Sequence, residues 1–244
     1  MSELLSRYQD AVHDLLAKVE TTQRENIVAA GEMIAECVIG GGAVHLSNIC
    51  HMIEYDLLNR GGGVAFYKRF HYDLTVDNKV RDRNRSGIDT SIEGLARYAL
   101  IASKALPGDI LFVSSVSGRT PRTVDLAWEA KKMGIKVVAL LSMEYAQAVE
   151  PTHSSGKKLY EMVDLVLDNC APAAEAMLEV EGLDAKFAAA SGISSAYILW
   201  SATAVAVEAM MKRGVTPGVF KSVNYPGGQA HYEKVLKDYE QRGY

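Results

Sequence analysis

The sequence predicts an α/β protein, a three-layer sandwich in which a five-stranded, mostly parallel sheet lies between layers of helices. Short apolar runs with β propensity occur near residues 43, 64, 109, 137 and 165, and helical segments separate them. With 244 residues the chain is long enough for one large domain with a substantial core. The alternation of strands and helices favours parallel strands joined by crossovers.

Two helices are expected before the first strand. Apolar residues recur at three- and four-residue steps over residues 2–19, which indicates an amphipathic helix. A second helical run, 27–38, ends at three consecutive glycines, 40–42. We therefore divide the chain into an N-terminal helical region, 1–42, which packs on the core or on a partner subunit, and a main domain, 43–244, with both forming one structural unit.

The remaining elements follow in order along the chain. The first strand, 43–46, leads into the turn Ser47-Asn48-Ile49-Cys50 and a helix from His51 to about residue 59. The other strands are expected at 64–70, 110–113, 137–141 and 165–167, with a helical pattern over 88–105. Residues 171–190 are less regular and are predicted to form a flap over a ligand or a subunit contact. A long helix, 191–211, and a last helical run that carries His231 complete the chain.

The turn after the central strand concentrates hydroxyl groups. Ser115, Ser117 and Thr120 surround Gly118, whose missing Cβ would let another group approach the backbone. Thr120 is expected to be an N-cap, because Pro121 fits the first position of a helix. A helix N-terminus with free N–H groups and several hydroxyls can bind an anion, most often a phosphate. Ordinary turn formation and capping explain the same residues equally well.

Composition excludes several classes of function. The net charge of −4 argues against a general nucleic-acid surface. The cysteines, Cys37, Cys50 and Cys170, are too few and scattered for a disulfide framework, which favours a reducing cytoplasm. The N-terminus lacks the uninterrupted apolar core of a signal peptide, and the apolar stretch 193–211 fits a buried helix better than a membrane span. We expect no nucleic-acid or membrane partner.

The segment Ser115-Val116-Ser117-Gly118-Arg119-Thr120 resembles the S-x-S-G-x-[ST] phosphosugar loop of SIS (sugar isomerase) domains. The likeness extends over nearly the whole chain, especially to single-domain SIS proteins described as phosphosugar or phosphoheptose isomerases. It implies a flavodoxin-like sheet order, a homo-oligomer (dimer or tetramer), and a sugar phosphate held by Ser115, Ser117 and Thr120, with Gly118 and Arg119 in the same loop. No cofactor and no metal site are predicted.

The first turn is expected to form the other half of this pocket. In SIS relatives that turn is usually glycine-rich, whereas this chain has Ser47, Asn48, Ile49 and Cys50 without a glycine. Ser47 and Asn48 can still donate hydrogen bonds to a ligand. His51 and Glu54 lie three residues apart, so they share a helix face. They can serve as metal ligands, as an acid/base pair, or simply as polar residues on a helix surface.

The predicted function is phosphosugar binding, with isomerisation between aldose and ketose forms. That reaction needs a base beside a carbonyl and a group that stabilises the enediolate. The catalytic candidates are Glu54, His51, His153 and His231, because carboxylates and imidazoles exchange protons near neutral pH. The altered first turn favours one alternative, a non-catalytic sugar-phosphate sensor. Another alternative is an SIS-type lyase or etherase acting on an amino-sugar phosphate.

Overall fold

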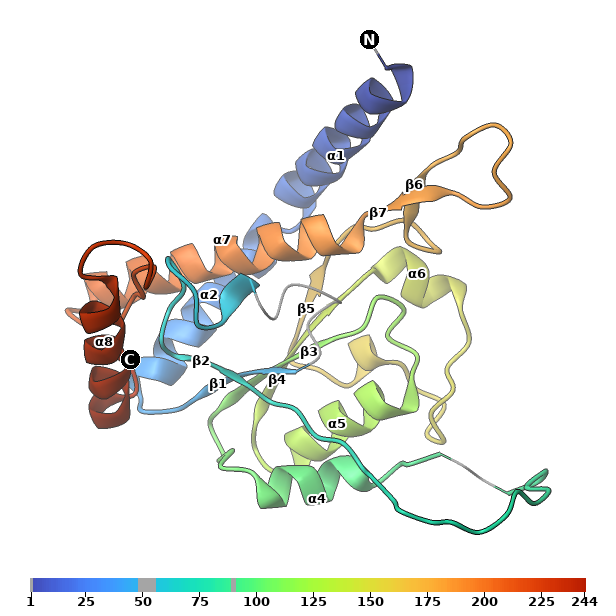
Figure 1. Ribbon diagram of the computed structural model, residues 1–244, viewed down its shortest axis with the longest axis horizontal. Helices are drawn as coiled ribbons and strands as arrows, with labels where there is room; N and C mark the ends of the chain where they lie inside the picture. Colours follow the sequence, from blue (N-terminus) through green and yellow to red (C-terminus); the bar gives the residue numbers. More distant parts are fainter. Residues whose placement is uncertain (1, 48–55, 89–90) are drawn as a thin grey trace.

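The computed structural model describes residues 2–47, 56–88 and 91–244 (Figure 1). Within these residues the centre is one sheet of five parallel strands in the order β2-β1-β3-β4-β5. The strands are β1 (Val44–Ser47), β2 (Tyr67–Arg69), β3 (Ile110–Ser114), β4 (Lys136–Leu141) and β5 (Leu165–Asp168). The α/β class, the parallel sheet and its flavodoxin-like order are therefore confirmed.

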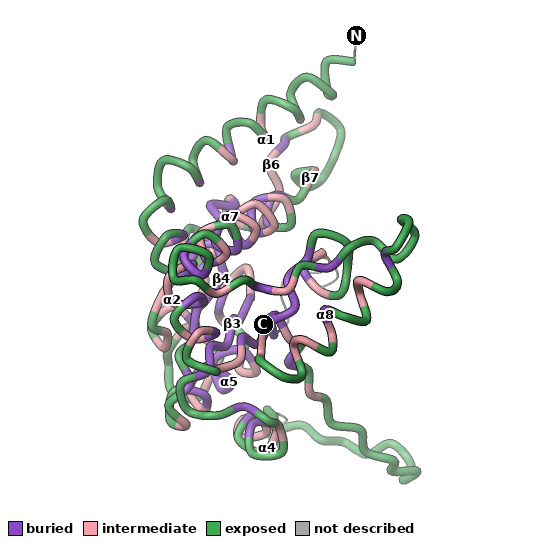
Figure 2. Tube along the Cα trace, turned by 90° about the vertical axis from the view of Figure 1, so that its left-hand side faces the viewer, coloured by how far each residue is buried: buried purple, intermediate pink, exposed green. Residues whose placement is uncertain are grey.

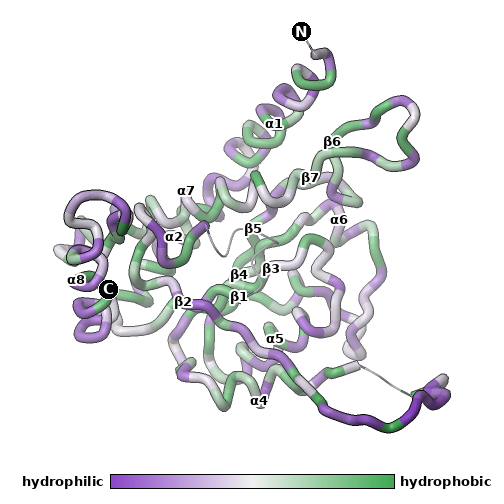
Figure 3. The backbone as a smooth tube through the Cα atoms, in the orientation of Figure 1, coloured by the Kyte–Doolittle hydropathy of each residue, from purple (hydrophilic) through white to green (hydrophobic). Residues whose placement is uncertain are grey.

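Alternation along the strands builds a core on each face of the sheet. In β3, Ile110 and Phe112 join the core under the helices α2 (Arg24–Ile39) and α7 (Ser191–Lys212). Leu111 and Val113 join the core under α4 (Leu95–Ala102) and α5 (Pro121–Lys132). The central strands β3 and β4 are buried except at Lys136 (Figure 2) and are mostly apolar (Figure 3), as expected for parallel strands covered on both faces.

The helices α2 and α7 pack unusually close together, and Gly31 makes this possible. A Cβ at Gly31 would lie only 2.5 Å from the Cβ of Val205 on α7. By length and composition α7 is the one helix among the described residues that could cross a membrane, and 50% of its most apolar stretch is buried inside the protein. Its packing against α2 and the sheet is that of a core helix.

The N-terminal helix α1 (Glu3–Thr22) extends beyond the body of the molecule together with a hairpin (Figures 1 and 2). The hairpin consists of the antiparallel strands β6 (Ala176–Leu178) and β7 (Phe187–Ala189), and it occupies the region that was expected to form a flap. A hydrogen bond of 2.5 Å from Arg7 Nη2 to the carbonyl of Glu179 joins the two projections.

Three further elements complete the described fold. They are α6 (Met143–Ala148), the 3₁₀ helix η1 (Leu159–Glu161) and α8 (Gly228–Arg242). The C-terminal helix α8 lies at the edge of the molecule in Figure 1 and packs through a small apolar cluster around Ala65, Phe220 and Val235.

The helix expected over residues 88–105 is shorter than its sequence pattern. It begins at Leu95, after Gly94, which has a left-handed φ of 91°. Asp125 on α5 accepts hydrogen bonds from the N–H groups of Gly94 (3.0 Å) and Ala96 (3.2 Å). A carboxylate from a neighbouring helix therefore fixes where α4 starts. The strand expected over 64–70 is also shorter, because Val64 instead forms an antiparallel bridge with Val219.

A buried carboxylate aligns the amino ends of β1 and β3. Asp109, only 4% exposed, accepts hydrogen bonds of 2.9 Å from the backbone N–H of Ala43, the backbone N–H of Leu106 and Nε2 of His45. Its own carbonyl accepts from the N–H of Lys136 at the start of β4. One residue thus sets the relative positions of three strands.

Replacement of this carboxylate should be costly. We expect Asp109→Ala to lower the free energy of unfolding by about 3–5 kcal/mol, because it leaves two backbone N–H groups and an imidazole without their acceptor. Asp184→Ala, at an exposed position in the β6–β7 hairpin, is the control and should change stability by less than about 0.5 kcal/mol. Urea unfolding followed by circular dichroism measures both variants. Equal stabilities would contradict the role assigned to Asp109.

Candidate functional site

The carboxyl ends of β1 and β3 bring two of the predicted site segments together. Ser47, the last residue of β1, lies opposite Val113 of β3, directly before Ser114 and the turn 115–120. Ligands bind at this edge in open α/β sheets. Ser47 is 1% exposed, and its hydroxyl makes no hydrogen bond to any described residue. The other predicted residues of the first turn and its helix, Asn48, His51 and Glu54, lie outside the described residues.

The turn 115–120 is held in place mainly through its carbonyl groups. The carbonyls of Val116, Gly118 and Arg119 accept hydrogen bonds from the N–H groups of Ser142 (3.0 Å), Leu159 (2.8 Å) and Thr152 (3.3 Å). The Thr152 hydroxyl also donates to the Arg119 carbonyl, at 2.8 Å. These bonds attach the turn to the chain that follows β4 and α6.

The backbone donors of the same turn are mostly free. Within the described part of the chain, the N–H groups of Val116, Ser117, Arg119 and Thr120 form no hydrogen bond. Only Ser115 and Gly118 donate, the former to the Leu140 carbonyl at 3.2 Å. Free N–H groups of successive residues, directly before a helix N-terminus, are the donors that an anion requires.

The hydroxyls of the turn differ in their partners. Ser117 Oγ has no hydrogen bond to any described residue, whereas Ser115 Oγ accepts from the Gly118 N–H at 3.2 Å. Thr120 is the N-cap of α5, as predicted, but its hydroxyl lies 2.8 Å from that of Thr123 and does not bond the helix backbone. Ser117 Oγ is therefore available to a ligand, and Ser115 Oγ, which only accepts from Gly118, can still donate its own hydrogen.

Gly118 has a different role from the one expected. It is buried and has a left-handed φ of 59°. A Cβ would lie 3.3 Å from Leu141 Cδ2 and 3.4 Å from Leu159 Cβ. The space left by the missing side chain is therefore occupied by the protein's own leucines, and the glycine serves the shape of the turn.

Two arginines place positive charge beside the turn. Arg119 is partly exposed and forms no ion pair with a described residue. Arg122, in the first turn of α5, lies over the Tyr72 ring at 4.5 Å and donates through Nη2 to the Tyr72 carbonyl. Burial raises the pKa of the Tyr72 phenol, and the Arg122 guanidinium opposes this shift. Arg122 Nη1 also lies 3.8 Å from the Asp73 carboxylate, so Arg122 has an anionic partner within the protein. Sequence reasoning overlooked this arginine.

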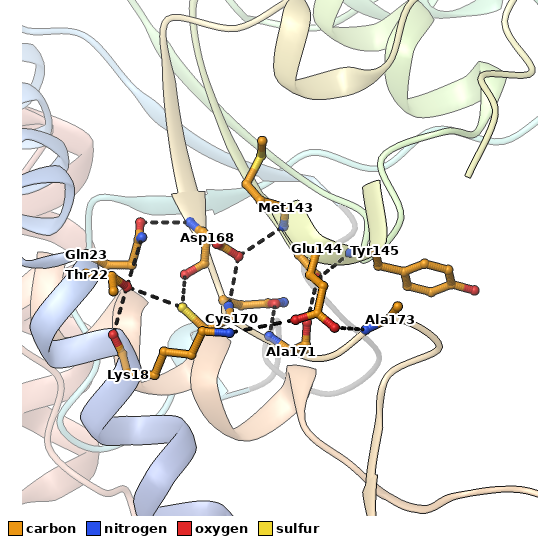
Figure 4. Close-up of polar contacts among 12 residues, drawn as sticks. Lys18, Thr22, Gln23, Met143, Glu144, Tyr145, Asp168, Cys170, Ala171 and Ala173 are labelled. Carbon is orange, nitrogen blue, oxygen red and sulfur yellow. Dashed lines mark hydrogen bonds and ion pairs between the residues drawn. The ribbon is translucent and has the colours of Figure 1, made fainter. Parts of the chain in front are cut away.

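The carboxyl end of β5 forms a second polar region, shown in Figure 4. Asp168 Oδ1 accepts from the N–H groups of Met143 (3.0 Å) and Cys170 (2.9 Å), while the Asp168 N–H donates to Gln23 Oε1. Glu144 accepts from the Ala173 N–H at 2.9 Å. These contacts fix the chain after β5 against α6 and α1. Every polar group in them has a partner within the protein, so this region supports the site and offers few groups to a ligand.

The two predicted histidines of the described chain differ in position: His153 follows Thr152, which bonds the turn, but its ring packs on α5, whereas His231 lies on α8. The His153 side chain is 8% exposed, and its ring stacks on Trp128 of α5 at 6.3 Å between ring centres. Its Nδ1 lies 2.8 Å from Ser155 Oγ, and its Nε2 lies 3.7 Å from the Glu93 carboxylate. His231 lies on α8, with Nε2 2.9 Å from the Val219 carbonyl, and Figure 1 shows α8 at the opposite end from α6. Their catalytic roles stay predictions.

No cluster of three or more His, Cys, Asp or Glu side chains that could hold a metal occurs in residues 2–47, 56–88 and 91–244.

The sequence matches one known protein family and is similar to known proteins over nearly its full length. Residues 7–142 match the SIS domain family. A UPF0309 protein of Streptomyces griseus is 32% identical over 243 residues, which covers 99% of this chain and 97% of that protein. A UPF0309 protein of Halalkalibacterium halodurans is 30% identical over 98% of this chain and 99% of its own length.

Solved structures share the fold at low sequence identity. The phosphoheptose isomerase GmhA from Neisseria gonorrhoeae superposes with a TM-score of 0.55 and 15% identity, covering 86% of this chain and 98% of that chain. A phosphoheptose isomerase from Francisella tularensis gives 0.52 and 16%, covering 87% and 100%. The Vibrio vulnificus NanR protein complexed with ManNAc-6P gives 0.50 and 16%, covering 99% and 70%.

The unpartnered hydroxyl of Ser47 gives a test of the site that needs no ligand. We expect Ser47→Ala to raise the free energy of unfolding by about 1 kcal/mol, because a buried hydroxyl without a partner is costly in the free protein. Ser142→Ala is the matched control. That hydroxyl is also buried near a strand end, but it donates to the Ala171 carbonyl at 2.6 Å, so its loss should destabilise the protein by about 1–3 kcal/mol. Thermal unfolding compares the two. Similar losses in both variants would show that Ser47 has a partner in solution.

Proposed function

The chain belongs to the SIS domain family, and we propose that it binds a sugar phosphate at the carboxyl edge of its sheet, with the phosphate held by the turn 115–120. Two structures of the same fold are phosphoheptose isomerases, and a third holds ManNAc-6P. A sugar phosphate is therefore the ligand class that these relatives favour for this chain.

The proposal rests on which polar groups of the turn form hydrogen bonds within the protein and which do not. Its carbonyls are bonded to the protein, whereas the N–H groups of Val116, Ser117, Arg119 and Thr120 and the Ser117 hydroxyl have no partner among the described residues. These donors lie close together on residues that are partly or fully exposed, so a ligand can reach them. Phosphate oxygens accept several hydrogen bonds at once, so they fit such a set of donors.

The charges beside the turn support the same ligand. Arg119 is free of ion pairs within the described chain, and Arg122 lies at the N-terminus of α5. Because Arg122 already pairs with the Asp73 carboxylate at 3.8 Å, the positive charge left for a phosphate comes mainly from Arg119. The phosphate-binding segment of the proposal thus comprises Ser115, Ser117, Gly118, Arg119 and Thr120. Ser47, the last residue of β1, and Asn48, the next residue in the sequence, are proposed to complete the site.

For the reaction, we propose isomerisation between aldose and ketose sugar phosphates. The base and acid are assigned to Glu54 and His51, which follow β1, the neighbour of β3 in the sheet. His153 is the weaker candidate, because its ring is packed between Trp128 and the Glu93 carboxylate. His231 can act only in a pocket shared with another copy of the chain, since α8 lies far from its own turn (Figure 1).

A non-catalytic sensor of sugar phosphates is the second candidate. The engagement of His153 favours it, because this removes one of the acid/base groups from the described part of the site.

In either case we propose a homo-oligomer in the cytoplasm. The exposed N-terminal half of α1 offers a subunit contact, and the free thiol of Cys37, whose pKa is raised by burial to about 11, suits a reducing compartment.

Ligand binding by the turn can be tested directly. We expect Ser117→Ala to weaken the binding of ManNAc-6P or a heptose phosphate by about tenfold or more, because a hydrogen bond to a charged group is lost. Arg119→Gln should act in the same direction, whereas Ser86→Ala, at an exposed position in the loop 73–88, should have no effect. Isothermal titration calorimetry measures the three constants. Unchanged affinity in Ser117→Ala would refute the site assignment.

Turnover separates the enzyme from the sensor. If the chain is an isomerase, NMR of a sugar-phosphate panel will show conversion, and Glu54→Gln will slow it by about 10²–10⁴-fold with the dissociation constant retained. Saturable binding by the wild-type protein with no conversion of any sugar in the panel would establish the sensor instead.

A further inference from the structure

A cavity of about 510 Å³ lies near the amino ends of β1 and β3, at the opposite edge of the sheet from the proposed phosphate turn, with which it shares no residue. Three separate parts of the chain line it. They are the strands β1 and β2, the segment after α4, and the last turns of α8. The volume is within the range of small-molecule sites, which commonly occur where distinct structural elements meet.

The cavity contains an imidazole with an available nitrogen. His45 alternates with Val44 and Leu46, which lie in the core under α2 and α7, so its side chain lies on the opposite face of the sheet. Nε2 is bonded to Asp109, and Nδ1 has no hydrogen bond within the described chain. The ring meets Phe70 edge-on at 6.1 Å. The bond to Asp109 holds the His45 ring at the cavity wall and leaves Nδ1 without a partner among the described residues.

Two lysines supply positive charge without carboxylate partners. The Lys68 ammonium lies 3.3 Å from the centre of the Tyr239 ring and has no ion pair within residues 2–47, 56–88 and 91–244. Burial lowers its pKa, and the nearby charge of Glu240 opposes this shift. Lys104 is exposed and is likewise without an ion pair among the described residues.

The balance of charge in the cavity favours an anion. The wall includes two carboxylates, Asp109 and Glu240. Asp109 already accepts hydrogen bonds from two backbone N–H groups and His45, so its acceptors are occupied. Among the described residues that line the cavity, Glu240 is then the one carboxylate left beside the two ammonium groups of Lys68 and Lys104.

The remaining wall is apolar. Phe70, Leu106 and Tyr239 contribute it, and Leu106 is 64% exposed, which is unusual for a leucine beside a cavity. An apolar or aromatic body in the cavity would cover this side chain. Binding such a body also contributes more affinity than an inorganic ion can obtain from two lysines.

We propose that this cavity is a second ligand site, which binds a small organic anion through Lys68 and Lys104. The ligand carries a carboxylate or phosphate on an apolar or aromatic body, which packs against Phe70, Leu106 and Tyr239. Because α8 is otherwise attached mainly through the cluster of Ala65, Phe220 and Val235, the ligand fastens α8 to the sheet. Support for this site does not depend on sugar-phosphate binding at the turn 115–120.

Benzoate and phenyl phosphate are suitable probes, since they share an aromatic body and differ in the oxyanion. Titrated into the full-length protein, at least one should shift the ring resonances of His45 saturably. At a concentration of about ten times its dissociation constant, the probe should slow amide exchange in α8 about tenfold. The probe that binds more tightly identifies the oxyanion. The absence of a saturable His45 shift with both probes would overturn the proposal.

Variants that each remove one positive charge test whether the two lysines bind the probe. Lys68→Gln and Lys104→Gln should each weaken the probe by about tenfold, the loss expected for one charged hydrogen bond. Lys237→Gln removes the same charge from an exposed position on α8 outside the cavity and should leave the affinity unchanged. Because Lys104 is exposed, its substitution does not threaten folding. Equal weakening in all three variants would mean that the probe responds only to net charge, which would also overturn the proposal.

Discussion

The alignment of β1 with β3 is the constraint on which the rest of this structure depends, and the Asp109 carboxylate maintains it. In a parallel sheet, a shift at the amino end of a strand moves its carboxyl end by the same distance. The bonds from Asp109 to the start of β1 therefore determine that Ser47 lies beside Val113. Asp164 repeats the arrangement for β4, because its carboxylate accepts from the Val137 N–H at 2.8 Å and its N–H donates to the Val137 carbonyl.

At the carboxyl edge of the sheet, the rigidity of the turn 115–120 determines how it can bind a ligand. Its carbonyls are bonded to Ser142, Thr152 and Leu159, so the unbonded N–H groups are already fixed before any ligand arrives. A preorganised set of donors loses little conformational entropy on binding. This arrangement lowers the stability of the free protein, in which the Ser47 hydroxyl and Nε of Arg122 are buried without partners among the described residues. Unsatisfied polar atoms near one strand edge are expected where function rather than stability has selected the residues.

Much of this could be predicted from the sequence, for identifiable reasons. Apolar runs located the central strands β3 and β4 best, because these are covered on both faces, whereas the edge strand β2 carries Lys68 and Arg69 and is shorter than its predicted run. The start of α4 could not be predicted, since Asp125 caps it from another helix. The groups that approach Gly118 could not be predicted, because only the folded chain brings Leu141 and Leu159 against it. Similarly, nothing local to His153 indicates that Trp128 and Glu93 hold its ring. Local patterns predict elements, whereas contacts between elements decide what each side chain can do.

The two sites meet on β1, and this limits how one can influence the other. His45 faces the cavity, and Ser47, two residues later on the same face, faces the turn 115–120. A short strand bonded on both sides and buried on both faces has no second arrangement available, so the sheet itself cannot switch. The mobile partner must be an element held by fewer contacts, and α8 meets this requirement because its apolar contact is one small cluster. A ligand in the cavity would therefore act by fastening α8, which also carries His231. If His231 completes a pocket of a neighbouring copy, the position of α8 links the cavity of one subunit to the sugar-phosphate site of the next.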